Sequence, residues 1–181
     1  MRIEHVAAAY MLAASHLNMT PKDAGSILVG FINGLSKQDH LNEIQACIDG
    51  AENLEAEIVD AIDKIGKLDI TDLISGFTEL VKVVSALPTE IKTCEAIQGD
   101  ITRIENWAKI FENPTAVIET VTKNLFLHYG AVTKDIAVIN TDLTNSEYEP
   151  AGEVMADLAI QVLGDIQSEQ VEIEKLQFTM W

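Results

Sequence analysis

The sequence has few aromatic residues, few prolines and no long apolar run. Only 6% of the 181 residues are aromatic and only four are proline, so long segments are free to form helices that pack through Ile, Leu, Val and Ala. No segment is long and uncharged enough to span a bilayer, which takes about 20 apolar residues. Low-complexity tracts are also absent. The composition therefore predicts one helical domain with, at most, short appendages.

Basic residues are scarce as well. The chain carries 12 Lys and Arg residues against 29 Asp and Glu residues, a formal net charge of −17. Such a molecule is repelled by nucleic-acid phosphates and by anionic lipid surfaces, which excludes both as partners. The acidity is typical of soluble proteins in general, and it also fits an extracellular protein in calcium-rich water. Because no EF-hand loop is present, we predict no specific calcium site.

Motifs that carry chemistry are missing too. There is no Gly-rich phosphate loop and no pair of Glu-x-x-His motifs of the kind found in di-iron bundles, and the four histidines share no metal-ligand spacing. His40 and Cys47 lie seven residues apart, about 10 Å along a helix, which is too far for a nucleophile and its base. We therefore predict no enzyme, no catalytic residue, no metal and no cofactor. His128, Trp107 and Phe111 are interpreted as core residues.

Four segments have the spacing of amphipathic helices, namely residues 40–68, 69–87, 88–113 and 114–143. Their apolar stripes recur every three to four residues and comprise Ile44, Cys47, Ala51, Leu54, Ile58, Ala61 and Ile65; Leu73, Phe77, Leu80, Val84 and Leu87; Cys94, Ile97, Ile101, Ile104, Ala108 and Phe111; and Ile118, Val121, Leu125, His128, Val132, Ile136, Ile139 and Leu143. Pro88 is predicted to end the second segment. Shorter helices are predicted at about residues 4–17, 21–35 and 150–164. Because the connections are short, we predict an all-α fold, an up-and-down bundle of four core helices with flanking terminal helices.

The charge is distributed unevenly along the chain. Residues 1–36 have no net charge, whereas the C-terminal end is strongly acidic. We therefore divide the chain into an apolar N-terminal segment (1–36), a helical bundle (37–166) and an extended C-terminal tail (167–181). The start resembles a secretory leader only weakly, because Glu4 and His5 interrupt its basic region. We expect it to be part of the working molecule.

The two cysteines are the most informative pair in the sequence. Cys47 and Cys94 each lie about one turn into a predicted helix, and in an up-down-up arrangement these two helices run parallel. The cysteines would then lie at the same height, which permits a disulfide with Cβ atoms about 4 Å apart. The alternative is two buried free thiols. Asn18-Met19-Thr20 forms an N-glycosylation sequon, which makes Asn18 a candidate glycosylation site and favours secretion.

Five stretches of the chain resemble a known protein family, and they read CIDGAENLEAEIVDAIDKI, LPTEIKTC, DITRIENWAKIFENP, KNLFLHYGAVTKDI and PAGEVMADLAIQVLG. The family consists of small predicted secreted helical proteins of ciliates and other protists, and the resemblance covers roughly residues 28–164. It is carried by the paired cysteines, the Leu-Pro before the second cysteine, the Trp and Phe before a proline, and the Asn-Leu ahead of His-Tyr. The resemblance implies an all-helical fold, a Cys47–Cys94 disulfide, export from the cell and no established activity.

The last eleven residues, VEIEKLQFTMW, alternate apolar and polar side chains in the manner of a β-strand. A lone strand needs a partner for its N–H and C=O groups. It could pair with the alternating MRIEHV segment of the same molecule, or add to a neighbouring molecule by strand addition. A helical or disordered tail is the third alternative. Four large apolar residues at the end argue against a freely exposed tail.

Two functional hypotheses follow from the apolar ends. The first is a secreted, extracellular structural protein that self-assembles into a filament or other oligomer through its terminal segments. The candidate assembly contacts are Val6, Tyr10, Leu12, Ile173, Leu176, Phe178, Met180 and Trp181. The alternative is a secreted monomeric bundle that carries a lipid or another apolar ligand between its helices.

Overall fold

The computed structural model describes residues 19–165 except 38–39, 50, 52–53 and 91. The elements in chain order are α2 (Pro21–Ser36), α3 (Leu41–Asp49), α4 (Glu55–Gly66), α5 (Ile70–Glu90), η1 (Lys92–Ile97), α6 (Gln98–Trp107), η2 (Ala108–Glu112), α7 (Pro114–Leu127), α8 (Tyr129–Thr144) and α9 (Tyr148–Leu163). Helices α2 to α9 are α-helices, whereas η1 and η2 are short 3₁₀ helices. No strand occurs in this part of the chain, so the predicted all-α bundle is confirmed.

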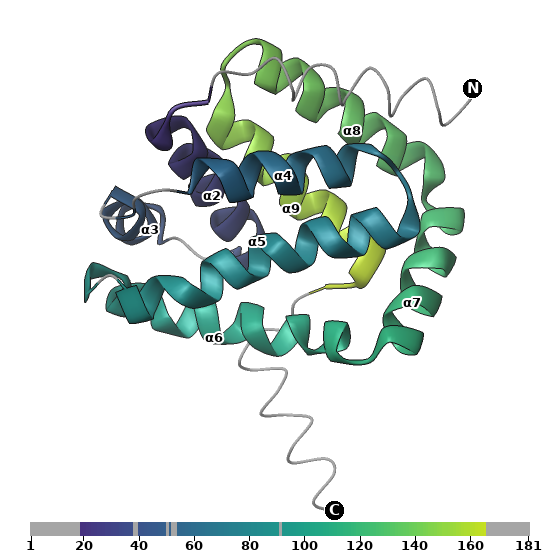
Figure 1. Ribbon diagram of the computed structural model, residues 1–181, viewed down its shortest axis with the longest axis horizontal. Helices are drawn as coiled ribbons and strands as arrows, with labels where there is room; N and C mark the ends of the chain where they lie inside the picture. The colour runs from purple at the N-terminus through teal and green to yellow at the C-terminus, as the bar shows by residue number, and fades with distance from the viewer. Residues whose placement is uncertain (1–18, 38–39, 50, 52–53, 91, 166–181) are drawn as a thin grey trace, which may run out of the picture.

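Helices α2 and α9 pack against each other at the centre of the bundle, although they are far apart in sequence (Figure 1). Two glycines allow this close approach. A methyl group on Gly30 would overlap the backbone carbonyl of Glu149, and one on Gly152 would overlap the backbone carbonyl of Ile27. The crossing therefore brings backbone against backbone, which only glycine permits at these two positions.

Helix α2 lies in the core, although the charge distribution of the sequence assigns residues 1–36 to a separate N-terminal segment. The apolar side chains of α2 are completely or almost completely buried, and they are Ala24, Ile27, Leu28, Val29, Phe31, Ile32 and Leu35. Phe31 stacks on Phe77 of α5, with ring centroids 6.5 Å apart. The first cap also forms as the sequence favours, because the Thr20 side chain accepts a hydrogen bond from the Asp23 N–H. Helix α9, predicted to flank the bundle, likewise lies in its core.

The other helices surround this central pair. Helices α4 and α5 pack on each other and contact α2, while α7 and α8 both pack on α9 along one side of the molecule (Figure 1). Helix α3 lies at the opposite side, between α2 and η1. The apolar faces of all these helices meet in one continuous core, so the described residues form a single packed unit.

Several helix boundaries differ from the predictions, and residues 88–113 are divided among the end of α5, η1, α6 and η2. Residues 40–68 form two helices, because α3 ends at Asp49 and is followed by Gly50, a weak helix former. Helix α5 continues through Pro88 to Glu90, so Pro88 does not end it, although proline removes one backbone hydrogen bond and crowds the preceding turn. Residues 114–143 also divide into two helices, at His128, whose φ of −118° and ψ of 24° are not helical.

Candidate functional site

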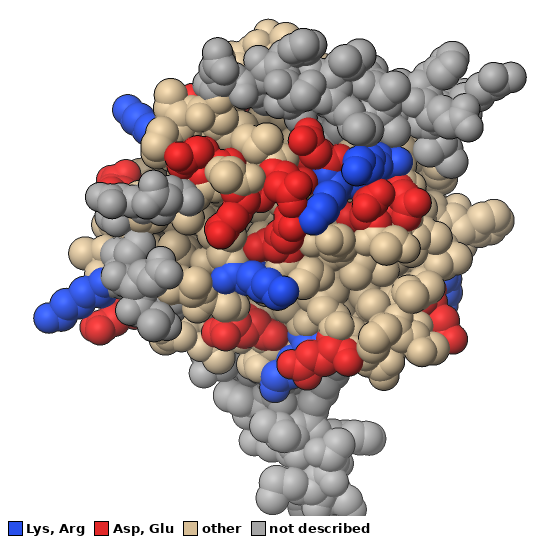
Figure 2. Space-filling model, viewed as in Figure 1, with Lys and Arg blue, Asp and Glu red and all other residues tan. Residues whose placement is uncertain are grey.

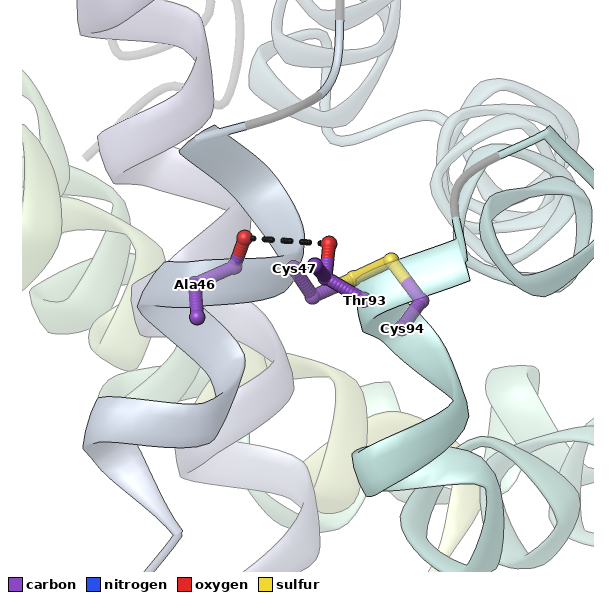
Figure 3. Close-up of a disulfide and its surroundings, with 4 residues drawn as sticks. All are labelled: Ala46, Cys47, Thr93 and Cys94. Atoms are coloured by element: carbon purple, nitrogen blue, oxygen red, sulfur yellow. Dashed lines mark hydrogen bonds between the residues drawn. A yellow bond between two sulfur atoms is a disulfide. The ribbon is translucent and has the colours of Figure 1, made fainter.

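A disulfide joins Cys47 of α3 to Cys94 of η1 (Figure 3). The two Cα atoms are 4.4 Å apart, and both residues are fully buried. Beside the bridge, the Thr93 hydroxyl donates a hydrogen bond of 3.3 Å to the carbonyl oxygen of Ala46. The predicted pairing is therefore present, although it joins a short helix to a 3₁₀ turn and not two long parallel helices.

A buried carboxylate, Asp100, lies at the centre of a second link between α2, α3 and α6. Its side chain is 4% exposed, and it accepts hydrogen bonds from both sides. His40 Nδ1 lies 2.8 Å from one of its oxygens and Arg103 Nη2 lies 3.3 Å from the other. Arg103 Nη2 also donates to the Ser36 carbonyl oxygen at the end of α2, at 2.9 Å. The hydrogen bond with Asp100 raises the pKa of His40 above its usual 6.5.

The His40–Asp100 pair, together with Arg103, links the ends of neighbouring helices. The Ser36 hydroxyl donates to the Asn33 carbonyl oxygen in its own helix, and Cys47 is committed to the disulfide. In the described ranges no hydrogen bond joins His40 to a hydroxyl or thiol side chain. The arrangement can lock α2 and α3 onto α6, and its strength depends on the charge of His40.

Charged residues of α4 and α5 form a surface cluster. Lys64 Nζ lies 3.0 Å from Asp60 and also donates to Glu79. A hydrogen bond with Glu79 lowers the pKa of Asp60, with a further hydrogen bond from Lys64 acting in the same direction. Burial raises the pKa of Glu79 and of Asp63. Figure 2 shows acidic and basic side chains interspersed over this face. Among the residues with a described placement, no group of three or more His, Cys, Asp or Glu could hold a metal ion.

Helix α7 ends in a patch of apolar side chains that face solvent. Phe126 is 84% exposed, Leu127 59% and Ile118 49%. We call these three residues the α7 patch. Ile118 and His128 were predicted to lie in the core, and both are exposed, so this prediction is wrong at these positions. His128 is exposed at the break between α7 and α8, whereas the stripe residues on either side of it, Val121 and Val132, are buried. In α7 the buried position belongs to Val117, the neighbour of Ile118.

The other predicted core aromatics are partly buried. Trp107 and Phe111 pack against the edge of the core, and the Trp107 indole N–H donates a 2.8 Å hydrogen bond to the Gly164 carbonyl oxygen. Trp107 therefore fixes the end of α9 to α6. Nearby, the Asn124 side chain of α7 donates to the Val162 carbonyl oxygen at 3.0 Å, which ties the same end of α9 to α7.

The predicted assembly contacts and the glycosylation candidate lie outside the described residues, and they are Val6, Tyr10, Leu12, Asn18, Ile173, Leu176, Phe178, Met180 and Trp181. Their roles stay predictions. Thr20, the third residue of the sequon, is exposed at the start of α2. None of the helices that the structure describes is long and apolar enough to cross a membrane.

The comparison with protein families decides where this chain belongs. The model of the SctB-like family, described as secreted protein B-like, matches residues 7–163. The chain belongs to the SctB-like family. This SctB-like protein is therefore a secreted protein, which confirms the predicted localisation and the resemblance to a family of secreted proteins. The part of that resemblance concerning ciliates and other protists stays a prediction. No curated protein and no solved structure matches the chain.

Proposed function

We propose that this SctB-like protein is a non-catalytic extracellular structural protein that assembles with copies of itself through its terminal segments. The observation that carries the proposal is the contrast between the bundle and the ends. The bundle is a complete unit, with a continuous core and a disulfide. The segments beyond residues 19–165 hold large apolar residues such as Tyr10, Phe178 and Trp181, and apolar side chains are most stable when they are covered.

The bundle contributes an outward-facing apolar surface of its own. The α7 patch exposes Ile118, Phe126 and Leu127, whereas the other large hydrophobic residues with a described side chain are buried or partly buried. Exposed apolar clusters commonly mark interaction surfaces. A secreted protein with a disulfide is also suited to a long life outside the cell, where the bond persists. Both features support a role as an assembly unit.

A native mass spectrum of the 181-residue chain tests the proposal. We expect a dimer or larger oligomers, with masses that are multiples of the monomer mass. A variant that lacks residues 168–181 should keep the helical circular dichroism of the parent and give the monomer only. A monomer that carries an adduct of lipid mass would instead favour a carrier of apolar ligands, and a bare monomer at high micromolar concentration would exclude self-assembly.

A further inference from the structure

Two residues of the α7 patch, Phe126 and Leu127, lie in a stretch of the chain that is free of acidic residues. Residues 120–134 contain Lys123 and Lys134 and no Asp or Glu, in a chain whose net charge is −17. Both lysines are exposed. Beside α7, at the right of Figure 1, the side chains in view in Figure 2 are mostly uncharged, with a few acidic and basic ones at the lower edge. The end of α7 thus combines exposed apolar residues with two lysines, and the exposed Glu119 lies at the other end of the patch, beside Ile118.

The apolar residues are placed to form a strip along α7. Ile118, Thr122 and Phe126 are all exposed and follow each other at intervals of four residues, which places them on one side of the helix. Leu127 extends the strip at its end, and beyond the break Gly130 and Ala131 add small exposed side chains. Such a strip can accept the apolar side chains of an extended or helical segment without any backbone pairing.

We infer that this strip receives the C-terminal tail of a second copy of the chain, an inference that rests on the proposed function. The tail matches the strip in both polarity and charge. Residues 166–181 hold Glu169, Glu172 and Glu174 against a single lysine. Opposite charges bordering an apolar contact favour association and fix its register. The apolar residues that would fill the strip are Leu176, Phe178, Met180 and Trp181.

The position of α9 favours a reciprocal exchange of tails. Asn124 of α7 donates a 3.0 Å hydrogen bond to the Val162 carbonyl oxygen, so the end of α9, the last described helix before the tail, lies beside the helix that carries the strip. Two copies that face each other across a two-fold axis can then each donate a tail and each receive one. Such an exchange fills both strips and closes the contact. The described residues include no strand edge, so side-chain docking takes the place of strand addition, which is one of the three alternatives that the alternating sequence leaves open.

Substitutions in the strip test the inference on the whole chain. The double variant Phe126→Ser, Leu127→Ser changes two exposed residues, so its helical signal and melting temperature should match those of the parent. Its self-association should weaken by about tenfold or more, because two buried hydrophobic side chains are lost from the interface. Lys123→Glu should weaken association, and adding Glu172→Lys to the Lys123→Glu variant should restore it. Lys82→Glu, which changes an exposed lysine of α5, is the matched control and should leave association unchanged.

Cross-linking identifies which copy supplies the tail. A photoreactive amino acid replaces Phe178 in a mixture of ¹⁵N-labelled and unlabelled chains. We expect cross-links from residue 178 to the segment 118–131, with half of them joining a labelled chain to an unlabelled one. Cross-links only within one chain would overturn the inference. A second pair of results would also overturn the inference. If the Phe126→Ser, Leu127→Ser variant associates like the parent while the variant that lacks residues 168–181 does not associate, the tail binds elsewhere. The proposed function would then remain intact. If the parent chain never associates, both the inference and the proposed function are wrong.

Discussion

At the residue scale, the two glycines at the crossing of α2 and α9 carry the tightest constraint in the bundle. Gly152→Ala places a methyl group against the backbone of Ile27. Since neither backbone can move without disturbing the core, we expect this substitution to lower the free energy of unfolding by about 1–3 kcal/mol. Urea unfolding followed by circular dichroism measures the difference.

A matched glycine provides the control for this prediction. Gly99 of α6 has no atom within 4 Å of an added Cβ, so Gly99→Ala should stabilise the protein by roughly 0.5–1 kcal/mol through its higher helix propensity. Equal effects of the two substitutions would mean that the α2–α9 crossing is looser than the structure indicates.

His40 makes a prediction with a definite sign. Its pKa is raised by the hydrogen bond with Asp100, so the folded state binds the proton more tightly than the unfolded state does. The added stability is therefore fully present below the unfolded pKa of about 6.5 and is lost as the pH rises through the folded pKa. We expect His40→Gln to lower the melting temperature more at pH 5.5 than at pH 8.5. A difference that is the same at both pH values would show that the His40–Asp100 pair contributes nothing through charge.

At the element scale, the disulfide holds the short helix α3 in place. Helix α3 buries only Ile44, Cys47 and Ile48, so a large part of its attachment comes from the Cys47–Cys94 bridge. The bridge closes a loop with a sequence separation of 47. On the chain-entropy estimate, this closure stabilises the folded state by about 4 kcal/mol.

The double variant Cys47→Ala, Cys94→Ala should therefore unfold at a markedly lower urea concentration than the oxidised parent. The chemically reduced parent is the control, because it keeps both side chains in the core and lacks only the bond. If the oxidised and reduced parents unfold at the same urea concentration, the disulfide has no stabilising role.

The sequence predicts the helices and their buried faces well where the apolar spacing is regular. Leu73, Phe77, Leu80, Val84 and Leu87 were all predicted to face the core, and all are buried. Periodicity reports one face of one helix, so it succeeds as long as the helix continues. It fails where a helix breaks without proline, as it does at His128.

Contacts between elements distant in sequence could not be predicted from these patterns. The close approach at Gly30 and Gly152 depends on how two helices cross, which no single stripe records. One feature of the sequence pointed to the link between His40 and Asp100. Asp100 lies three residues after Ile97, on the buried face of its helix, where an unpaired carboxylate would be strongly destabilising. The Asp100 carboxylate was therefore expected to have a positively charged partner, but the sequence does not show that this partner is His40.

The exposure of Phe126 or Leu127 could also have been predicted from the sequence. Adjacent residues on a helix point about 100° apart, so two large apolar neighbours rarely both reach the core. The functional interpretation of the tail depends on residues that the structure does not describe, and it stays a prediction.

At the scale of the whole molecule, the acidic composition predicts higher stability at mildly acidic pH. Burial raises the pKa of Asp63, Glu79, Asp135 and Asp142, and the pKa of His40 is raised as well. The folded state thus binds more protons than the unfolded state between about pH 8 and pH 5, so stability falls as the pH rises.

The net charge of −17 adds to this effect, because self-repulsion decreases as carboxylates are protonated. We expect the melting temperature to rise as the pH is lowered from 8 to 5, and 0.5 M salt to reduce the difference by screening. The lowered pKa of Asp60 acts in the opposite direction only at more acidic pH, below its usual value of 3.8. A melting temperature that falls steadily from pH 8 to pH 5 would contradict this prediction.

The central claim is that the bundle is complete while the terminal segments bind other copies. Sedimentation velocity of the 181-residue chain, from low to high micromolar concentration, tests it most directly. We predict a weight-average sedimentation coefficient that rises with concentration, and a constant monomer value for the variant that ends at residue 167. A constant monomer value for the 181-residue chain over the whole range would contradict the claim.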